Sequence, residues 1–311
     1  MKKFLYFLLK MSLCFVTVFS LLVSVLLFFP ANVYDTSYQA VIQRKFDVLK
    51  QTEGKKIIIV GGSNASFGID EEKIEAETGY AVVNLGLHAG FGAIVPTELS
   101  KANIGQGDIV LLAYEWGWQG YKYFETFGTD LVISGFDDRL DMYYQLPAKH
   151  YSKLIGYLME NFKKKLQYQP PSGVYSAEAF DEKGRMIYQR PETCLVYEGH
   201  EDTFGRVDVG DGTIADDVVE YLTEYKRYVE AQGAKVYFVA PPVYEGAITG
   251  SEEGFAQLLR NAEEQLGISY ISNPADYFFP NEWIYDTPYH CTTVGEQRRT
   301  ELLIADLKKV L

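Results

Sequence analysis

One long uncharged segment, residues 11–30, constrains this chain more than any other feature of its sequence. It is predominantly apolar, and at a rise of about 1.5 Å per residue it is long enough to cross the hydrocarbon core of a bilayer. Three lysines and no acidic residue lie in residues 1–10. Because flanking positive charge favours the cytoplasmic side, we expect residues 1–10 in the cytoplasm, a single-pass transmembrane helix, and the remainder outside the membrane.

Two other interpretations of this segment were weighed. A cleaved signal peptide has an apolar core of about 7–15 residues and a small-residue cleavage site, whereas the exit here reads Phe-Phe-Pro-Ala-Asn-Val-Tyr. A buried core helix would carry a polar face, and this segment is apolar on every side. An uncleaved anchor is therefore favoured, and with either an anchor or a signal peptide residues 31–311 are exported.

The composition limits the classes of function. The chain carries 42 acidic and 29 basic side chains, a net charge of −13, and nucleic-acid binding requires a basic surface. We therefore expect no nucleic-acid partner. The three cysteines offer no metal spacing and no disulfide framework, although Cys194 and Cys291 could form one bridge. The sequence accordingly predicts no metal site and no cofactor.

Beyond the apolar segment, residues 31–54 are polar and predict a juxtamembrane stalk. From residue 55 onward, short apolar runs alternate with segments of helical spacing. This alternation predicts an α/β domain over residues 55–311, with a parallel sheet and helices on both faces. The expected strands are 56–60, 81–85, 108–113, 235–240 and 268–271, and the expected helices are 70–78, 94–103, 214–231, 252–266 and 293–310.

Residues 117–213 interrupt this alternation and are rich in tyrosine. We interpret them as a cap inserted over the edge of the sheet. The tyrosine rings could stack on sugars or could pack the cap onto the sheet, and both interpretations remain open. His150 and His200 are expected at the surface, and Lys163–Lys165 is expected to be a solvated helix face.

The first candidate for chemistry is the turn that contains Gly62, Ser63 and Asn64, which follows the first strand and leads into a helix. In parallel sheets, ligands bind at the carboxyl ends of the strands. A hydroxyl at this position would lie beside backbone N–H groups that can bind an oxyanion. A glycine-rich turn with a Ser/Asn cap explains the same residues without any catalysis. Ser66 is a second candidate nucleophile, although a capping role suits it better.

The second candidate is the pair Asp286 and His290, just before the last predicted helix. A serine hydroxyl is a weak nucleophile until an imidazole takes its proton, and that imidazole needs an acceptor to hold its tautomer. A turn aspartate beside a surface histidine is the structural alternative for such a pair. The chain order Ser63, Asp286, His290 favours the catalytic interpretation.

These ordered blocks resemble the SGNH (GDSL-type) hydrolases over roughly residues 55–116 and 214–311. The resemblance implies a three-layer α/β/α sandwich and a Ser-His-Asp mechanism. Ser63 would be the nucleophile, His290 the general base and Asp286 the residue that orients the imidazole. The backbone N–H groups of Ser63 and Gly86 would form the oxyanion hole.

The third block departs from the pattern of this family, which usually supplies an asparagine side chain as an oxyanion donor. Here the third strand leads into Tyr114-Glu115-Trp116, and an ionised carboxylate cannot donate a hydrogen bond. Three residues also separate Asp286 from His290, where two are usual. We expect Gly62, Asn64, His88 and Glu115 to line the pocket, with simple packing as an equal alternative for His88.

An exported, membrane-anchored chain of this type is similar to the SGNH proteins that modify cell-envelope polymers. The resemblance implies a serine esterase or O-acyltransferase that acts on acetyl or D-alanyl esters of an envelope polysaccharide or polymer. A multi-spanning acyl exporter is a possible membrane partner. The alternative is an inactive SGNH-fold protein that serves the envelope as a binding or accessory module.

Overall fold

The computed structural model describes residues 2–311, in which a parallel sheet forms the centre of the fold. Its strands are β1 (Lys56–Gly61), β2 (Ala81–Asn84), β3 (Ile109–Ala113) and β4 (Lys235–Phe238). The order across the sheet is β2-β1-β3-β4, and every pair is parallel. The predicted α/β class with a parallel sheet is therefore confirmed. The chain passes from β1 to β2 on one side and then crosses to β3 on the other, so a crevice is expected at the carboxyl ends of β1 and β3.

The last predicted strand, 268–271, forms only one parallel bridge, between Phe238 and Tyr270. It lies along the free edge of β4 but pairs too briefly to extend the sheet. Two further short strands, β5 (Val243–Tyr244) and β6 (Phe278–Phe279), form a separate parallel pair.

Helices cover both faces of the sheet: α2 (Val41–Gln51), α4 (Glu71–Thr78), α5 (Ile94–Ser100), α10 (Asp216–Ala231) and α12 (Thr293–Leu307). Successive side chains of a strand point to opposite faces. Ile57 and Ile59 of β1 therefore pack with α4 and α12, and Ile58 and Val60 pack with α2, α5 and α10. Helix α11 (Glu252–Asn261) continues into a turn over Ala262–Leu266. The predicted helices 70–78, 94–103, 214–231, 252–266 and 293–310 are thus present, with shifted ends.

Helix α2 belongs to the folded domain, so the expected stalk over residues 31–54 is wrong for this segment. Val41, Ile42, Phe46 and Leu49 are at most 1% exposed. Their spacing gives one apolar face on a helix whose other residues are mostly polar. The average polarity of the segment concealed that face.

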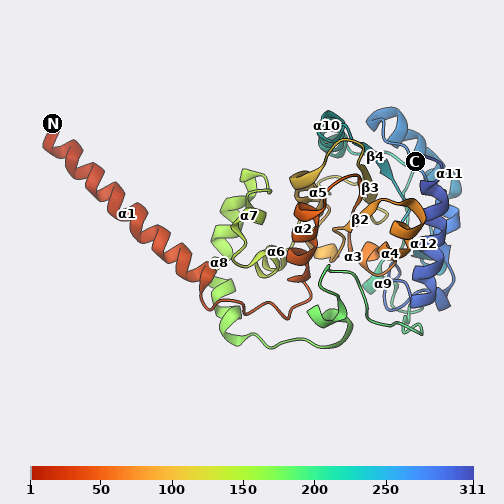
Figure 1. Ribbon diagram of the computed structural model, residues 1–311, viewed down its shortest axis with the longest axis horizontal. Coiled ribbons are helices and arrows are strands. Elements are labelled where there is room, and N and C mark those ends of the chain that lie inside the picture. The colour runs from red at the N-terminus through yellow and green to blue at the C-terminus, as the bar shows by residue number, and fades with distance from the viewer. Residues whose placement is uncertain (1) are drawn as a thin grey trace.

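Helix α1 (Lys2–Phe28) projects from the domain (Figure 1) and is exposed along nearly all of its length. Within residues 2–311 it is the one helix that is long and apolar enough to cross a membrane. Only Leu26 and Leu27, at its carboxyl end, are buried. The anchor therefore joins the domain through its last turn.

The insertion over residues 117–213 has two parts. The first contains α6 (Thr129–Phe136), α7 (Leu140–Tyr143) and α8 (Tyr151–Gln167), which lie on the side of the domain from which α1 projects (Figure 1). The second follows α8, contains α9 (Glu201–Phe204), and is joined to the loop before α12 by the hydrogen bond from Cys194 N–H to the Tyr285 carbonyl. The second part lies near Asp286 and His290, whereas the segment that precedes α6 contributes Tyr123 to a cavity beside Glu115.

Three polar residues of the insertion test the surface predictions. His200 is exposed, as expected. His150 is buried and packs edge-on against Phe127 at a ring-centroid distance of 5.1 Å. Lys165 is also buried, because its ammonium group pairs with Asp137. The predictions for His150 and Lys165 are therefore wrong.

Candidate active site

Ser63 begins the short helix α3 (Ser63–Ser66), directly after the end of β1. Gly61 is in register with Ala113 of β3, and a Cβ atom at Gly61 would lie 2.6 Å from the Ala113 carbonyl oxygen. A glycine at this position therefore lets the two strand ends approach closely. This contact places Ser63 at the carboxyl edge of the sheet, in the crevice expected between β1 and β3.

Asn64 fixes the turn that carries Ser63. Its amide nitrogen donates to the Ala113 carbonyl at 3.0 Å, and its amide oxygen accepts from Arg299 Nη2 at 3.0 Å. Arg299 Nη1 also donates to the Asn64 carbonyl. Arg299 is buried, and this burial lowers the pKa of its guanidinium to about 10. Asn64 is completely buried among these partners, so it is a support for the turn and not the pocket residue that the sequence predicted.

Asp286 and His290 form a direct pair. His290 Nδ1 lies 2.8 Å from Asp286 Oδ1, and the His290 N–H donates to the Thr287 carbonyl at 3.2 Å, which closes a turn between the two residues. Because a carboxylate only accepts hydrogen bonds, Nδ1 carries the proton that the two groups share, and Nε2 is then the nitrogen available for a base. Burial acts to raise the pKa of Asp286, but the hydrogen bond and charge of His290 hold that pKa below its usual value.

The ring of Phe67 lies flat against the imidazole of His290. The two ring centroids are 3.9 Å apart and the planes differ by 10°. Phe67 itself is fully buried. The imidazole is thus held in its plane by stacking and within that plane by Asp286.

Tyr175, from the insertion, completes this arrangement. Its hydroxyl donates to Asp286 Oδ2 at 2.5 Å and lies 3.4 Å from His290 Nδ1. Burial, followed by the neighbouring Asp286, raises the pKa of Tyr175, so the phenol remains a donor. The sequence contained Tyr175 only as one of many tyrosines of the insertion. Its separation of 111 residues from Asp286 left no pattern that could single it out.

Ser63 and His290 line the same cavity, which has a volume of about 360 Å³. Both residues are largely buried. Within the described residues, 2–311, Ser63 Oγ and His290 are not hydrogen-bonded to each other. The cavity wall combines polar and aromatic residues: Tyr38, Ser63, His88, Ala89, Glu115, Tyr175, Thr203, Phe204, Thr287, Pro288, Tyr289 and His290.

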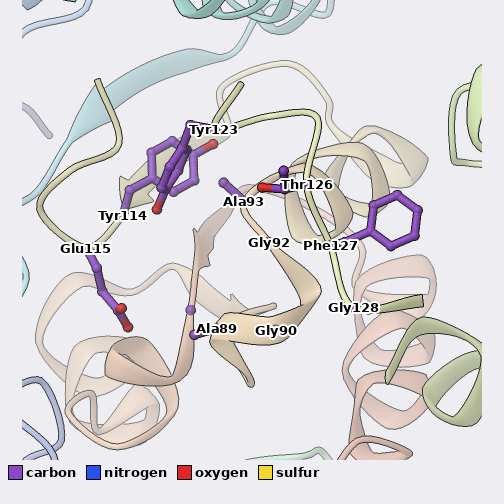
Figure 2. A pocket seen from close by; sticks show the side chains of 11 residues that line it. Ala89, Gly90, Gly92, Ala93, Tyr114, Glu115, Tyr123, Thr126, Phe127 and Gly128 are labelled. Atoms are coloured by element: carbon purple, nitrogen blue, oxygen red, sulfur yellow. The ribbon is translucent and has the colours of Figure 1, made fainter. Parts of the chain in front are cut away.

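A second cavity of about 380 Å³ adjoins the first and shares Ala89 and Glu115 with it. Figure 2 shows Glu115 on its wall, together with the aromatic rings of Tyr114 and Tyr123. Gly62 also lines this second cavity, and a Cβ there would lie 3.1 Å from Glu115 Oε1. Burial raises the pKa of Glu115, against the charge of His290 and a hydrogen bond from Asn64. The carboxyl group therefore stands between the two cavities.

The backbone N–H of Gly86, which was expected to donate to an oxyanion, has another partner in the structure. Its N–H donates to Asn84 Oδ1 at 3.0 Å, and its carbonyl accepts from the Ser66 hydroxyl. The N–H is therefore engaged in this conformation. Ser66 is buried with its hydroxyl directed at that carbonyl, which leaves Ser63 as the serine of this turn that faces the cavity.

His88 lines the Ser63 cavity and is partly buried there. Its Nδ1 accepts from the Gly90 N–H at 2.8 Å. Burial, and then the charge of His290, lowers the pKa of His88. Burial, His290 and the hydrogen bond from Gly90 all favour the neutral form of this ring.

Cys194 and Cys291 are free thiols, so the bridge that the sequence left open is not formed. Among residues 2–311, no group of three or more His, Cys, Asp and Glu side chains is arranged to hold a metal ion. The polar groups at the cavity thus include the Ser63 hydroxyl, the imidazoles of His88 and His290, the carboxyl group of Glu115 and the Tyr175 phenol, with Asp286 behind His290.

Comparisons with protein-family models and with curated proteins gave no match. The case for a function therefore depends on the site itself, in which a serine and an Asp-His pair from distant parts of the sequence line one cavity.

Proposed function

We propose that this chain is a membrane-anchored SGNH-type serine esterase or O-acyltransferase whose active site faces away from the cytoplasm. One observation carries the proposal: Ser63 and the Asp286–His290 pair line one cavity at the carboxyl edge of the sheet. Nucleophile, base and orienting acid occur in that order along the chain, as in the resemblance noted above. The helices on both faces of the parallel sheet are consistent with the sandwich of those hydrolases.

In the proposed reaction, Ser63 Oγ attacks the carbonyl carbon of an acyl ester while His290 Nε2 accepts the hydroxyl proton. Asp286 stabilises the resulting imidazolium, and Tyr175 holds the second carboxylate oxygen. The imidazolium then returns the proton to the departing alcohol, and an acyl-Ser63 ester remains. Water or another hydroxyl then attacks the carbonyl carbon of this ester and gives its proton to His290. The bond to Ser63 Oγ breaks, the acyl group leaves as a carboxylic acid or a new ester, and His290 returns the proton to Ser63 Oγ.

The substrate that we propose is an acetyl or D-alanyl ester of a cell-envelope polysaccharide or polymer. The two adjoining cavities, which share Ala89 and Glu115, offer separate spaces for a small acyl group and for the alcohol that bears it. The helix α1 would keep the site close to such polymers. A multi-spanning acyl exporter in the same membrane would be a suitable source of acyl groups for a transferase.

Covalent labelling with a fluorophosphonate probe tests the proposal. The wild-type protein should be labelled, and Ser63→Ala should lose all labelling. The matched control is Ser66→Ala, three residues away in the same turn, which should still be labelled. Thermal unfolding of both variants checks that they are folded. Labelling of Ser63→Ala at the wild-type rate would reject Ser63 as the nucleophile.

The second candidate function is a catalytically inactive binding protein of the envelope, and two observations favour it. The Gly86 N–H is already engaged with Asn84, and the carboxyl group of Glu115 lies where a donor is expected. An ionised carboxylate there would repel an oxyanion. This alternative predicts no labelling of the wild-type protein together with saturable binding of an envelope glycan, which titration calorimetry would measure.

A further inference from the structure

An exposed apolar stripe runs along α8. Ile155, Met159 and Leu166 are 46%, 51% and 60% exposed, and the partly buried Phe162 lies between the last two. Spacings of four, three and four residues place these side chains on one face of the helix. Contiguous exposed apolar surface of this kind marks an interaction site.

This stripe is additional to the face by which α8 packs on the domain. The buried face consists of Leu154, Leu158, Asn161 and Lys165. Each buried residue precedes a member of the exposed stripe by one position, so the two faces are adjacent around the helix. Packing on the domain explains the first face and leaves the second unexplained.

The exposed stripe begins where α1 ends. Val23 and Leu27 of α1 line an apolar cavity of about 170 Å³ together with Ile155. Lys165 Nζ donates to the Leu27 carbonyl at 2.7 Å, which ties α8 to the last turn of α1. Tyr144 lines the same cavity and is otherwise exposed. Tyrosines are enriched where a transmembrane segment meets water.

The charge of α8 is opposite to that of the whole chain. The helix holds four lysines and one glutamate, whereas the chain has a net charge of −13. Lys153, Lys163 and Lys164 are all exposed. Lys163 flanks the apolar stripe, whereas Lys153 and Lys164 lie on the opposite face of the helix and contact the Phe127 carbonyl and Asp130. A helix with apolar and cationic surfaces of this kind binds at the interface of an anionic membrane.

We infer that α8 is an interfacial helix whose stripe binds the anionic phospholipid surface of the membrane that α1 spans. This inference requires α1 to be a membrane span, as the proposed function does, and it is independent of any catalysis. The α7–α8 side of the domain faces α1 (Figure 1), so the stripe and the end of α1 contact one bilayer surface. The domain then contacts the membrane through both α1 and the stripe on α8, and these two contacts together fix its orientation.

Fluorescence quenching in proteoliposomes tests this inference on the full chain. The vesicles contain equal amounts of phosphatidylcholine and phosphatidylglycerol, with bromine on the acyl chains. A fluorophore is attached to Ile155→Cys or Met159→Cys in a background with Cys14→Ser and Cys194→Ser, the two exposed native cysteines. The buried Cys291 stays in place. The control is Val294→Cys, an exposed position on α12 at the opposite side of the domain from α8 (Figure 1).

A separate variant with Cys194→Ser alone keeps native Cys14, which is exposed on α1 and serves as the reference for the span itself. The expected result is strong quenching at Cys14, quenching at Ile155→Cys and Met159→Cys, and none at Val294→Cys. Replacing phosphatidylglycerol with phosphatidylcholine should weaken quenching on α8 by about twofold and leave Cys14 unchanged.

Three outcomes would overturn the inference. Quenching at Cys14 together with full access of both α8 labels to an aqueous quencher would place the stripe in water. If neither the brominated lipid nor the aqueous quencher reaches the α8 labels, a protein covers the stripe. An absence of quenching at Cys14 would reject the membrane span as well, whereas fluorophosphonate labelling of Ser63 reports separately on catalysis.

Discussion

Two polar clusters, one fully buried and one partly exposed, differ in a way that separates support from candidate chemistry. The anchor cluster consists of Lys165, Asp137 and the carbonyls of Leu27 and Pro30. Its ammonium group has three donors and meets all three acceptors: the Leu27 carbonyl at 2.7 Å, the Pro30 carbonyl at 3.4 Å, and the Asp137 carboxylate. The side chain of Lys165 is completely buried. Every donor is therefore satisfied within the protein.

The cavity cluster consists of Tyr175, Asp286 and His290. Tyr175 and His290 Nδ1 satisfy the two carboxylate oxygens of Asp286, but the imidazole retains Nε2 for another partner. That imidazole lines a cavity together with the hydroxyl of Ser63. The two clusters also differ in burial, because Tyr175 is 41% exposed whereas the side chain of Lys165 is completely buried. The second difference is that an imidazole nitrogen of the cavity cluster is left beside a cavity with polar walls, whereas the acceptors of the anchor cluster surround the ammonium group of Lys165.

The largest effect is expected from removing the base of the cavity cluster. His290→Ala should lower kcat for an aryl acetate by about 10⁴-fold, because the serine then has no group to take its proton. The matched control is His200→Ala, an exposed histidine of the insertion, which should leave kcat unchanged. Steady-state kinetics of both variants makes the comparison, and equal rates would remove the distinction between the two clusters.

The next effect concerns the anchor cluster and stability. Lys165→Met should lower the free energy of unfolding by about 3–5 kcal/mol, because Asp137 is left as an uncompensated buried charge. Lys164→Met, at the exposed neighbouring position, should cost less than about 0.5 kcal/mol. Guanidinium unfolding in detergent micelles, followed by tryptophan fluorescence, measures both.

A second substitution sharpens this test of the anchor cluster. Asp137→Leu added to Lys165→Met should recover part of the lost stability, because no buried charge then remains without a partner. If Lys165→Met alone is as stable as the wild-type protein, the cluster does not fasten α1 to the domain.

A smaller effect is expected from Tyr175→Phe in the cavity cluster. The phenol acts through Asp286, so its loss should lower kcat by about tenfold with little change in KM. Its hydrogen bond also holds the pKa of Asp286 down, so the acid limb of the pH–rate profile should move to higher pH. Tyr188→Phe, at an exposed tyrosine, is the control. An unmoved profile would contradict a positioning role for Tyr175.

The smallest effect is the dependence of stability on pH that Asp286 contributes. Its pKa in the folded protein lies below the usual value of 3.8, despite burial, because of His290 and Tyr175. As pH falls below 3.8, the unfolded chain takes up the proton first, so the contribution of Asp286 to stability is lost. The wild-type protein should therefore lose more stability on acidification than Asp286→Asn. Parallel slopes in acid denaturation would contradict this prediction.

Local sequence patterns were sufficient for much of this molecule. The uncharged run at residues 11–30 predicted the long apolar helix, and buried strands followed by glycine turns predicted the parallel sheet. Asp286 and His290 lie four positions apart, so a single turn brings them together, and their pairing was accessible from the sequence. The helix and the Asp-His pair depend on residues that are close along the chain, and each strand is recognised from its own short segment although its pairing partners are distant.

The tertiary structure decided what depends on contacts between distant segments. Tyr175 reaches Asp286 from the insertion, α2 is buried although its sequence is mostly polar, and Lys165 is buried because the end of α1 supplies its acceptors. The Gly86 N–H donates to the Asn84 side chain two residues away, but that side chain is held by hydrogen bonds to the Ala65 carbonyl and to Glu71. Periodicity and spacing describe one segment at a time, whereas burial and hydrogen-bond partners depend on which segments meet.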